Sequence, residues 1–186
     1  MKATGIVRRI DELGRVVVPK EIRRTLRIRE GDPLEIFTDR DGEVILKKYS
    51  PIRELDDFAK EYAESLYLSS GHIVCVTDKD AIVAVSGAPK KDYMDRSIHA
   101  EVDKIINERE KALINRGSGS RRPIPICADE RDGTEYTSQV IMPIISAGDV
   151  IGAVILLSRE EGTQMGQTEL KLAETAAGFV GRQLGQ

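Results

Sequence analysis

The first fifty residues are divided by turn signals into segments that are too short to enclose a core of their own. In chain order, the patterning predicts strands at Thr4–Ile10 and Arg15–Val18, a helix at Lys20–Ile28, and strands at Leu34–Asp39 and Glu43–Lys48. A segment of about fifty residues buries little apolar surface, so without disulfides or a metal it needs a partner. We therefore expect this segment to form an obligate dimer.

Turn residues mark the limits of these elements. The helix is expected to end at Gly31, because glycine is the usual left-handed cap. Arg40-Asp41-Gly42 predicts a hairpin turn between the last two strands. Ser50-Pro51 then ends the segment, because the residue before a proline avoids the helical region. The sequence therefore predicts two domains, residues 1–52 and residues 53–186.

The formal net charge of −3 conceals an uneven distribution of charge. Residues 1–50 carry a net charge of +3, and residues 51–186 carry −6. Residues 1–29 hold nine basic and three acidic side chains, and seven of the nine are arginines. Arginine is suited to bidentate contacts with phosphate and guanine, so this pattern indicates a nucleic-acid partner. A charge run is also typical of a solvated surface, and the charge alone does not decide between the two.

The N-terminal segment resembles the AbrB-type transition-state regulators. The resemblance rests on GIVRRIDELGRVVVPKEIRRTL at residues 5–26, GDPLEI at 31–36 and VILKKY at 44–49. It implies a swapped-hairpin β-barrel of two intertwined chains that binds double-stranded DNA through arginines. The positions that match the family's DNA-contacting arginines are Arg8, Arg15, Arg23 and Arg24. Further candidates for phosphate contacts are Lys2, Arg9, Lys20 and Arg27.

The remainder of the chain has the periodicities of a folded domain. It has no Trp, and the whole chain has only three Phe and five Tyr, so we expect an aliphatic core. Helices are predicted at 53–68 and 168–183, a mostly helical segment at 95–115, and a loop at 116–122. Strands are predicted at His72–Thr77, Ala81–Val85, Thr137–Ile145 and Val150–Ser158. This order predicts an α+β fold with a central antiparallel sheet flanked by helices.

The C-terminal domain resembles GAF-type sensor domains, most clearly in the hairpin at residues 143–154. Together, the AbrB-type N-terminal segment and this domain are similar to transcriptional regulators that activate and repress sporulation-stage genes. The residues that carry this similarity are Tyr49–Ile52, Asp57–Ala63, Ala84–Gly87 and Ala173–Phe179. The resemblance implies that the C-terminal domains pair as well as the N-terminal domains, which would give a homotetramer. The C-terminal domain then either binds a small-molecule effector or serves only for oligomerisation.

The remaining reactive residues do not form a recognisable catalytic or metal site. Cys75 lies in an apolar strand and is expected to be a buried small hydrophobe, whereas Cys127 is expected to be more exposed. Neither belongs to a Cys-x-x-Cys pair, and His72 and His99 are too few for a His-based metal site. The turn Asp78–Asp80 has ordinary turn chemistry. We therefore expect no catalytic residues, metal or cofactor.

Three classes of function stay open. The first is a DNA-binding regulator that reads loosely defined, A·T-rich DNA, because its arginines come mainly from strands and loops. The second is an antitoxin-like repressor whose remainder masks a toxin, although such a remainder is usually a short extended tail. The third is a redox or ligand-converting enzyme, for which nothing in the sequence lowers a thiol pKa.

The sequence contains no signal for the membrane. Its apolar runs are far shorter than the ~18 residues of a membrane-spanning helix. No apolar h-region follows the N-terminus, and cysteine usage fits a reducing cytoplasm. Together with the family resemblance, this predicts a cytoplasmic, nucleoid-associated protein of the developing spore compartment.

Overall fold

The computed structural model describes residues 5–54, 56–117, 121–133 and 135–185. Its contacts divide the chain into two units, residues 1–49 and residues 50–186, and each unit is considered by itself. We refer to them as the head and the body. Over the described ranges, no helix is both long and apolar enough to cross a membrane.

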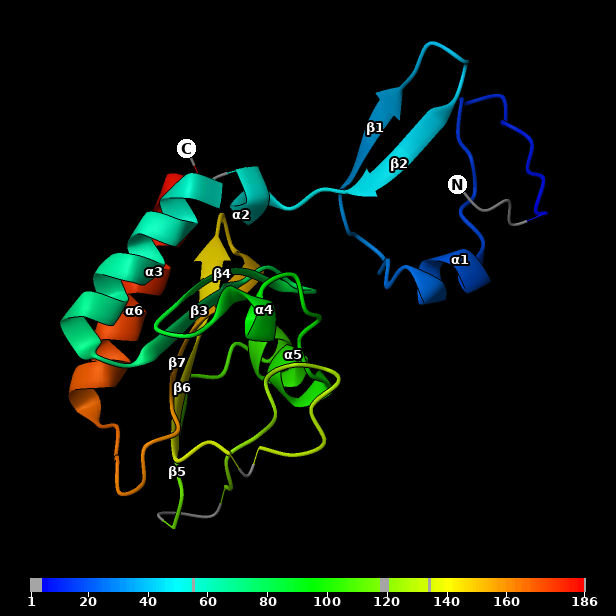
Figure 1. Ribbon diagram of the computed structural model, residues 1–186. Helices are drawn as coiled ribbons and strands as arrows, with labels where there is room; N and C mark the ends of the chain where they lie inside the picture. Colours follow the sequence, from blue (N-terminus) through cyan, green and yellow to red (C-terminus); the bar gives the residue numbers. More distant parts are fainter. Residues whose placement is uncertain (1–4, 55, 118–120, 134, 186) are drawn as a thin grey trace. The chain divides into compact units, whose positions relative to one another are not determined.

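The head contains a short helix and a hairpin (Figure 1). The helix α1 spans Lys20–Thr25, and the strands are β1 (Leu34–Thr38) and β2 (Val44–Lys48). The two strands pair antiparallel, from Leu34 opposite Lys48 to Thr38 opposite Val44. Gly42 has a φ of +80°, so the predicted turn at residues 40–42 is confirmed.

Two predicted strands of the head are absent from the single chain. Residues 5–10 and 15–18 have no regular secondary structure, although the turn between them does form. Gly14 N–H donates to the Asp11 carbonyl at 3.0 Å, and Gly14 has a φ of +74°. A strand requires a ladder of hydrogen bonds to a neighbouring strand, and neither of the two sheets in the described part of the chain includes these residues. The strand prediction is therefore wrong for one chain alone.

The helix α1 is shorter than predicted because the chain leaves it at Arg27 and not at Gly31. Arg27 adopts a left-handed φ of +52°. Ile28 N–H then donates to the Arg23 carbonyl at 2.7 Å, the long-range bond of a Schellman motif. Lys48 Nζ donates to the Arg27 carbonyl at 2.8 Å, which ties the end of the helix to β2.

The body is an antiparallel sheet with helices on both faces (Figure 1). Its elements are α2 (Pro51–Glu54), α3 (Asp56–Ser70), β3 (Ile73–Thr77), β4 (Ile82–Ser86), α4 (Lys90–Tyr93), α5 (Ala100–Asn107), β5 (Ala112–Asn115), β6 (Ser138–Ser146), β7 (Asp149–Ser158) and α6 (Gln167–Gln183). The strand order is β4-β3-β7-β6-β5. The predicted α+β class, the two strand pairs and the closing helix are confirmed.

One strand of the sheet was not predicted. Residues 112–115 form β5, whereas the sequence predicted a mostly helical segment over 95–115. The helix α5 ends at Asn107, and Arg109 then turns the chain with a left-handed φ of +57°. Ala112 and Ile114 are buried while Leu113 is exposed, which is the alternation of a strand. Four residues are too few for periodicity to separate a strand from a helix.

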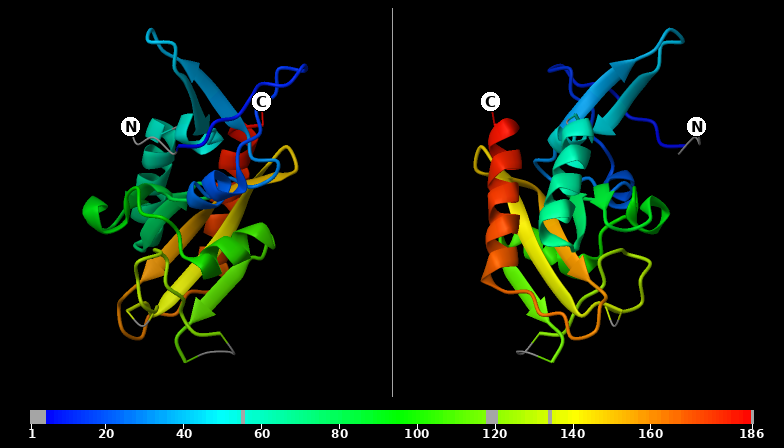
Figure 2. Two further views of the ribbon diagram at one scale, coloured as in Figure 1. Left: turned by 90° about the vertical axis from the view of Figure 1, so that its right-hand side faces the viewer. Right: turned by 60° about the vertical axis from the view of Figure 1, so that its left-hand side comes forward.

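The sheet separates two aliphatic cores. On one face, α3 and α6 lie side by side and bury alanines such as Ala63 and Ala176 (Figure 2). The opposite core contains α5, with Val102, Ile105 and Ile106 fully buried. Adjacent strand residues alternate between the two cores, because successive side chains of a strand point to opposite faces. The body is therefore closed by its own residues.

Ile52 and Cys127 show where burial differs from expectation. Ile52 is fully buried in the α3–α6 core of the body; the domain boundary predicted between residues 52 and 53 stays a prediction. Cys127 is also fully buried, so the prediction of a more exposed Cys127 is wrong. The cause is a β-bridge with Ile98, which holds the Cys127 segment against the α5 core.

Candidate nucleic-acid interface

The four arginines that match the AbrB-type pattern lie on three successive segments of the head. Arg8 lies in the irregular segment 5–10, Arg15 follows the 11–14 turn, and Arg23 and Arg24 lie in the last turn of α1. Arg8, Arg15 and Arg24 are exposed, whereas Arg23 is half-buried. Exposed guanidinium groups retain their charge in water and are available to phosphate.

Arg15 is held by an acidic residue of its own turn. Its Nε donates to Asp11 Oδ2 at 2.7 Å, and its backbone N–H donates to Asp11 Oδ1 at 2.8 Å. These bonds with Arg15, led by the backbone bond, lower the pKa of the Asp11 carboxyl. The sequence predictions did not include Asp11, although its spacing of four from Arg15 was a readable signal.

Arg23 differs from its neighbours in having a buried nitrogen without a partner. Its Nε is shielded from solvent and makes no hydrogen bond within the part of the chain that the structure describes. A buried unsatisfied donor is destabilising, and such groups usually find a partner. The position of Arg23 is therefore consistent with a contact supplied from outside this chain.

The candidates for additional phosphate contacts are also exposed where the structure describes them. Arg9, Lys20 and Arg27 have exposed side chains. Lys2 lies outside the described residues. Arg40, at the tip of the β1–β2 hairpin, is a further exposed cation that the predictions did not single out. These residues extend the positive charge of the head beyond the four matched arginines.

The head exposes most of its apolar side chains in the single chain. Pro19 is the one buried residue among residues 5–49. The large apolar side chains exposed there are Ile6, Val7, Ile10, Leu13, Val16, Val17, Leu26, Ile36, Phe37, Val44 and Leu46, and Val7 reaches 85% exposure. Soluble monomers rarely expose contiguous apolar surface on this scale, so these side chains indicate an interface.

The cysteines of the body are poorly suited to thiolate chemistry. Cys75 and Cys127 are free thiols and both are fully buried; for Cys75, burial was predicted. Burial raises the pKa of Cys127 to about 12 and raises that of Cys75 as well. The thiols therefore stay protonated near neutral pH, which removes the nucleophile that a redox site would need.

A polar network lies at the edge of the α5 core. The hydroxyls of Tyr93 and Tyr136 are 3.2 Å apart, and Arg159 Nη2 donates to the Tyr93 hydroxyl at 2.7 Å. Glu130 Oε1 accepts from the Tyr136 hydroxyl at 3.1 Å. Burial raises the pKa of Tyr93 to about 12 and also raises that of Tyr136. Burial therefore keeps both phenols protonated near neutral pH, and the network supplies their hydroxyls with partners within the body.

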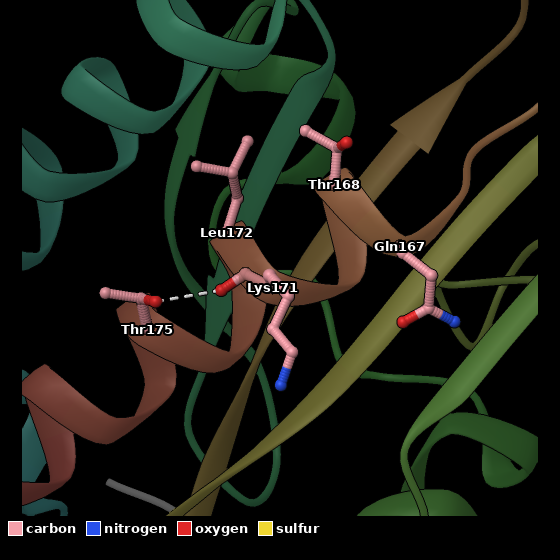
Figure 3. Close-up of a pocket in the computed structure, with 5 residues that line it drawn as sticks. All are labelled: Gln167, Thr168, Lys171, Leu172 and Thr175. Atoms are coloured by element: carbon pink, nitrogen blue, oxygen red, sulfur yellow. Dashed lines mark hydrogen bonds between the residues drawn. The ribbon is translucent and has the colours of Figure 1, made fainter.

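A surface depression of about 470 Å³ lies along α6 (Figure 3). Its lining residues, Gln167, Thr168, Lys171, Leu172 and Thr175, all come from this helix. Their side chains diverge from the helix and do not converge on a common point (Figure 3). A small-molecule site usually has convergent polar groups in an apolar pocket. The depression therefore lacks the convergent lining that is typical of a small-molecule site.

Comparison with known proteins finds a matching family model for each part of the chain. Residues 54–185 match the family model described as stage V sporulation protein T C-terminal, transcription factor. Residues 7–54 match the model described as antidote-toxin recognition MazE, bacterial antitoxin. Stage V sporulation protein T of Bacillus subtilis (strain 168) is 56% identical over 186 residues, which cover all of both chains.

Two further similarities concern the separate parts. The transition state regulatory protein AbrB of Bacillus subtilis is 51% identical over 74 residues, covering 40% of this chain and 76% of AbrB. The GAF domain from Acinetobacter phosphoenolpyruvate-protein phosphotransferase has a TM-score of 0.54 at 12% identity, covering 73% of this chain and 82% of that chain. The second likeness shows the fold alone. The predicted resemblances to AbrB-type and GAF-type proteins are confirmed.

Proposed function

Because the chain belongs to the stage V sporulation protein T family of transcription factors, we propose that it is a DNA-binding regulator that activates and represses sporulation-stage genes. The full-length identity of 56% to a member of that family carries the proposal. The excess of arginine in residues 1–29 supports the head as the DNA-binding part. In this proposal the protein acts in the cytoplasm, at the nucleoid of the developing spore compartment.

The proposed contacts to DNA are made by Arg8, Arg15, Arg23 and Arg24 from paired chains. If all of these arginines of a dimer neutralise phosphates, the log–log dependence of affinity on salt should have a slope of roughly −7. Replacing Arg23 or Arg24 with alanine should weaken binding about tenfold or more without unfolding the protein. Fluorescence anisotropy with labelled duplexes measures both quantities. Arg131→Ala, on the exposed surface of the body, is the matched control and should bind as the wild type does.

Wild-type affinity in one of these alanine variants would remove that residue from the interface. We expect loose sequence readout, weighted toward A·T-rich and deformable duplexes, because shape contributes strongly to readout by strands and loops. Selection from random duplexes tests this expectation. A single invariant site with steep losses at every mismatch would contradict it.

We propose that heads pair as swapped hairpins and that bodies pair as well, which gives a tetramer. The exposed apolar side chains of the head support the first contact. On the body, Phe179 of α6 stacks on Phe58 and Tyr62 of α3, with ring centroids 5.6 and 5.5 Å apart. Phe179 is 36% exposed, which supports pairing through this face. Light scattering of the full chain should give four times the chain mass, and a full-length dimer would refute the tetramer.

The role proposed for the body is oligomerisation. The core around α5 is filled by buried side chains of the body itself, which favours this role over effector binding. A small-molecule effector that bound within this core would have to displace groups such as the paired hydroxyls of Tyr93 and Tyr136. Thermal stabilisation of the full chain by a sporulation-stage metabolite would revive the effector hypothesis.

An antitoxin role is a second candidate because residues 7–54 match a model described as a bacterial antitoxin. The body argues against it. A toxin-masking tail is extended, whereas residues 50–186 form a sheet with two cores of their own. To test the antitoxin role, the chain is overexpressed in cells and then removed by induced degradation, and the survival of the cells is measured. Death after that loss would support the antitoxin role.

A further inference from the structure

The turn of residues 11–15 is organised around one carboxylate. Asp11 Oδ1 accepts the backbone N–H of Leu13 at 3.0 Å and that of Arg15 at 2.8 Å. Asp11 N–H donates to the Arg15 carbonyl at 3.0 Å, and Gly14 N–H donates to the Asp11 carbonyl at 3.0 Å. One oxygen of Asp11 therefore fixes the backbone of the turn.

The second oxygen has a different partner. Asp11 Oδ2 accepts from Arg15 Nε at 2.7 Å, a charge-assisted bond. The Arg15 side chain is nevertheless 70% exposed, and its terminal Nη amines are not part of this ion pair. The pair therefore restrains the guanidinium without covering the edge that a phosphate or a base would contact.

Electrostatics alone would not favour the Asp11 carboxylate beside Arg15 on a surface that binds DNA. A carboxylate on a DNA-binding surface repels phosphate, so its removal should strengthen binding. Arginine, however, has a flexible side chain that loses rotamer freedom when it binds. A carboxylate that already holds the guanidinium reduces that loss, because preorganisation lowers the entropic cost of binding.

We propose that Asp11 is a positioning residue for DNA binding, which holds the Arg15 guanidinium in the orientation that contacts DNA. The inference rests on the proposed function, since it assumes that Arg15 contacts DNA. It makes a prediction of opposite sign to the electrostatic expectation. Removal of the negative charge at Asp11 should weaken DNA binding, although the head then becomes more positive.

The test compares Asp11→Asn with Glu12→Gln in the full chain. The amide keeps an acceptor for the backbone N–H groups of the turn but is a weaker partner for Arg15 Nε. Glu12→Gln removes the same charge from the neighbouring exposed position. With an A·T-rich and a G·C-rich duplex of equal length, Asp11→Asn should bind about fivefold more weakly. Glu12→Gln should bind as tightly as the wild type or about twofold more tightly.

A double-variant cycle separates positioning from folding. In an Arg15→Ala background, Asp11→Asn should cause no further loss of affinity, because the group that it positions is gone. Circular dichroism and light scattering of each variant check the fold and the assembly. If Asp11→Asn unfolds, Asp11→Ser provides a shorter acceptor for the same turn.

Each result of the cycle has a definite meaning. Equal or tighter binding by a folded Asp11→Asn variant would overturn the inference. An equal loss with and without the Arg15 side chain would also overturn it, because Asp11 would then act through the fold of the turn. Wild-type affinity in Arg15→Ala would overturn the assignment of Arg15 to the interface, which belongs to the proposed function, and the inference with it.

Discussion

The head and the body bury apolar surface in opposite ways. Pro19 is the one buried residue among residues 5–49, whereas the body contains two cores on the faces of one sheet. The body therefore has closed cores of its own, whereas we expect the head to bury its apolar side chains against a partner chain, as the proposed assembly requires. If the head folds only in an assembly, as we propose, loss of the assembly should abolish DNA binding as well.

The largest effect on stability is expected from a substitution that creates a cavity in the core of the body. Leu156 lies in β7 and is fully buried in the α3–α6 core. Leu156→Ala should lower the free energy of unfolding of the body by about 2–5 kcal/mol, through lost burial and the cavity that remains. Urea unfolding followed by circular dichroism measures the change. Leu68→Ala, at a position 75% exposed in α3, is the matched control and should change stability little. A loss below 1 kcal/mol at Leu156 would contradict a core closed by the body alone.

The second prediction separates the two units. Residues 1–52 should form a folded dimer that still binds DNA, because the partner chain supplies the missing core. Its unfolding midpoint should rise with protein concentration, as mass action requires for an obligate dimer. Calorimetry over a hundredfold concentration range measures this shift. A folded monomeric fragment would contradict the proposal that the head needs a partner chain to complete its core.

The same difference explains which parts of the fold could be predicted from the sequence. The strands of the body were readable because each is an apolar run bounded by turn residues, such as Val150–Ser158. The strands predicted at residues 4–10 and 15–18 have suitable residues, but residues 5–10 and 15–18 belong to neither sheet of the described part of the chain. The burial of Cys127 depends on its bridge to Ile98, a contact between distant segments that a local pattern does not reveal.

The candidate site was predictable to a similar degree. The four arginines were identified because they match a known family, and charge alone did not separate them from Arg9 or Arg27. Asp11 was not singled out because its contacts depend on the geometry of the turn, in which one carboxylate contacts both the backbone and the side chain of Arg15. Residue spacing allows that contact but does not require it.

A smaller effect on stability is expected when glycine replaces a residue that has a left-handed backbone conformation, and each unit contains such a residue. Arg27 has a φ of +52° in the head, and Ala147 has a φ of +48° in the β6–β7 turn of the body. Glycine adopts this conformation without strain, so Arg27→Gly and Ala147→Gly should each stabilise the protein by up to about 1 kcal/mol. Arg27→Gly should also weaken DNA binding slightly if Arg27 contacts phosphate, whereas Ala147→Gly should not. Paired unfolding and anisotropy measurements test both, and equal DNA affinity would exclude Arg27 from the interface.

The smallest effect on stability concerns two ion pairs at the surface of the body, which share one carboxylate. Lys111 and then Lys171 lower the pKa of Glu174 from 4.5 to about 2 by donating hydrogen bonds to its carboxylate. The folded pKa lies below the unfolded one, so the contribution to stability is complete above pH 4.5 and is lost as the pH falls toward 2. Both lysines are exposed and the Glu174 side chain keeps 35% of its surface in contact with solvent, so solvent screens these ion pairs and the contribution is small. The difference in unfolding free energy between the wild type and Glu174→Gln should therefore shrink between pH 5 and pH 3. If that difference stays constant over this range, the lysines do not stabilise the charged carboxylate.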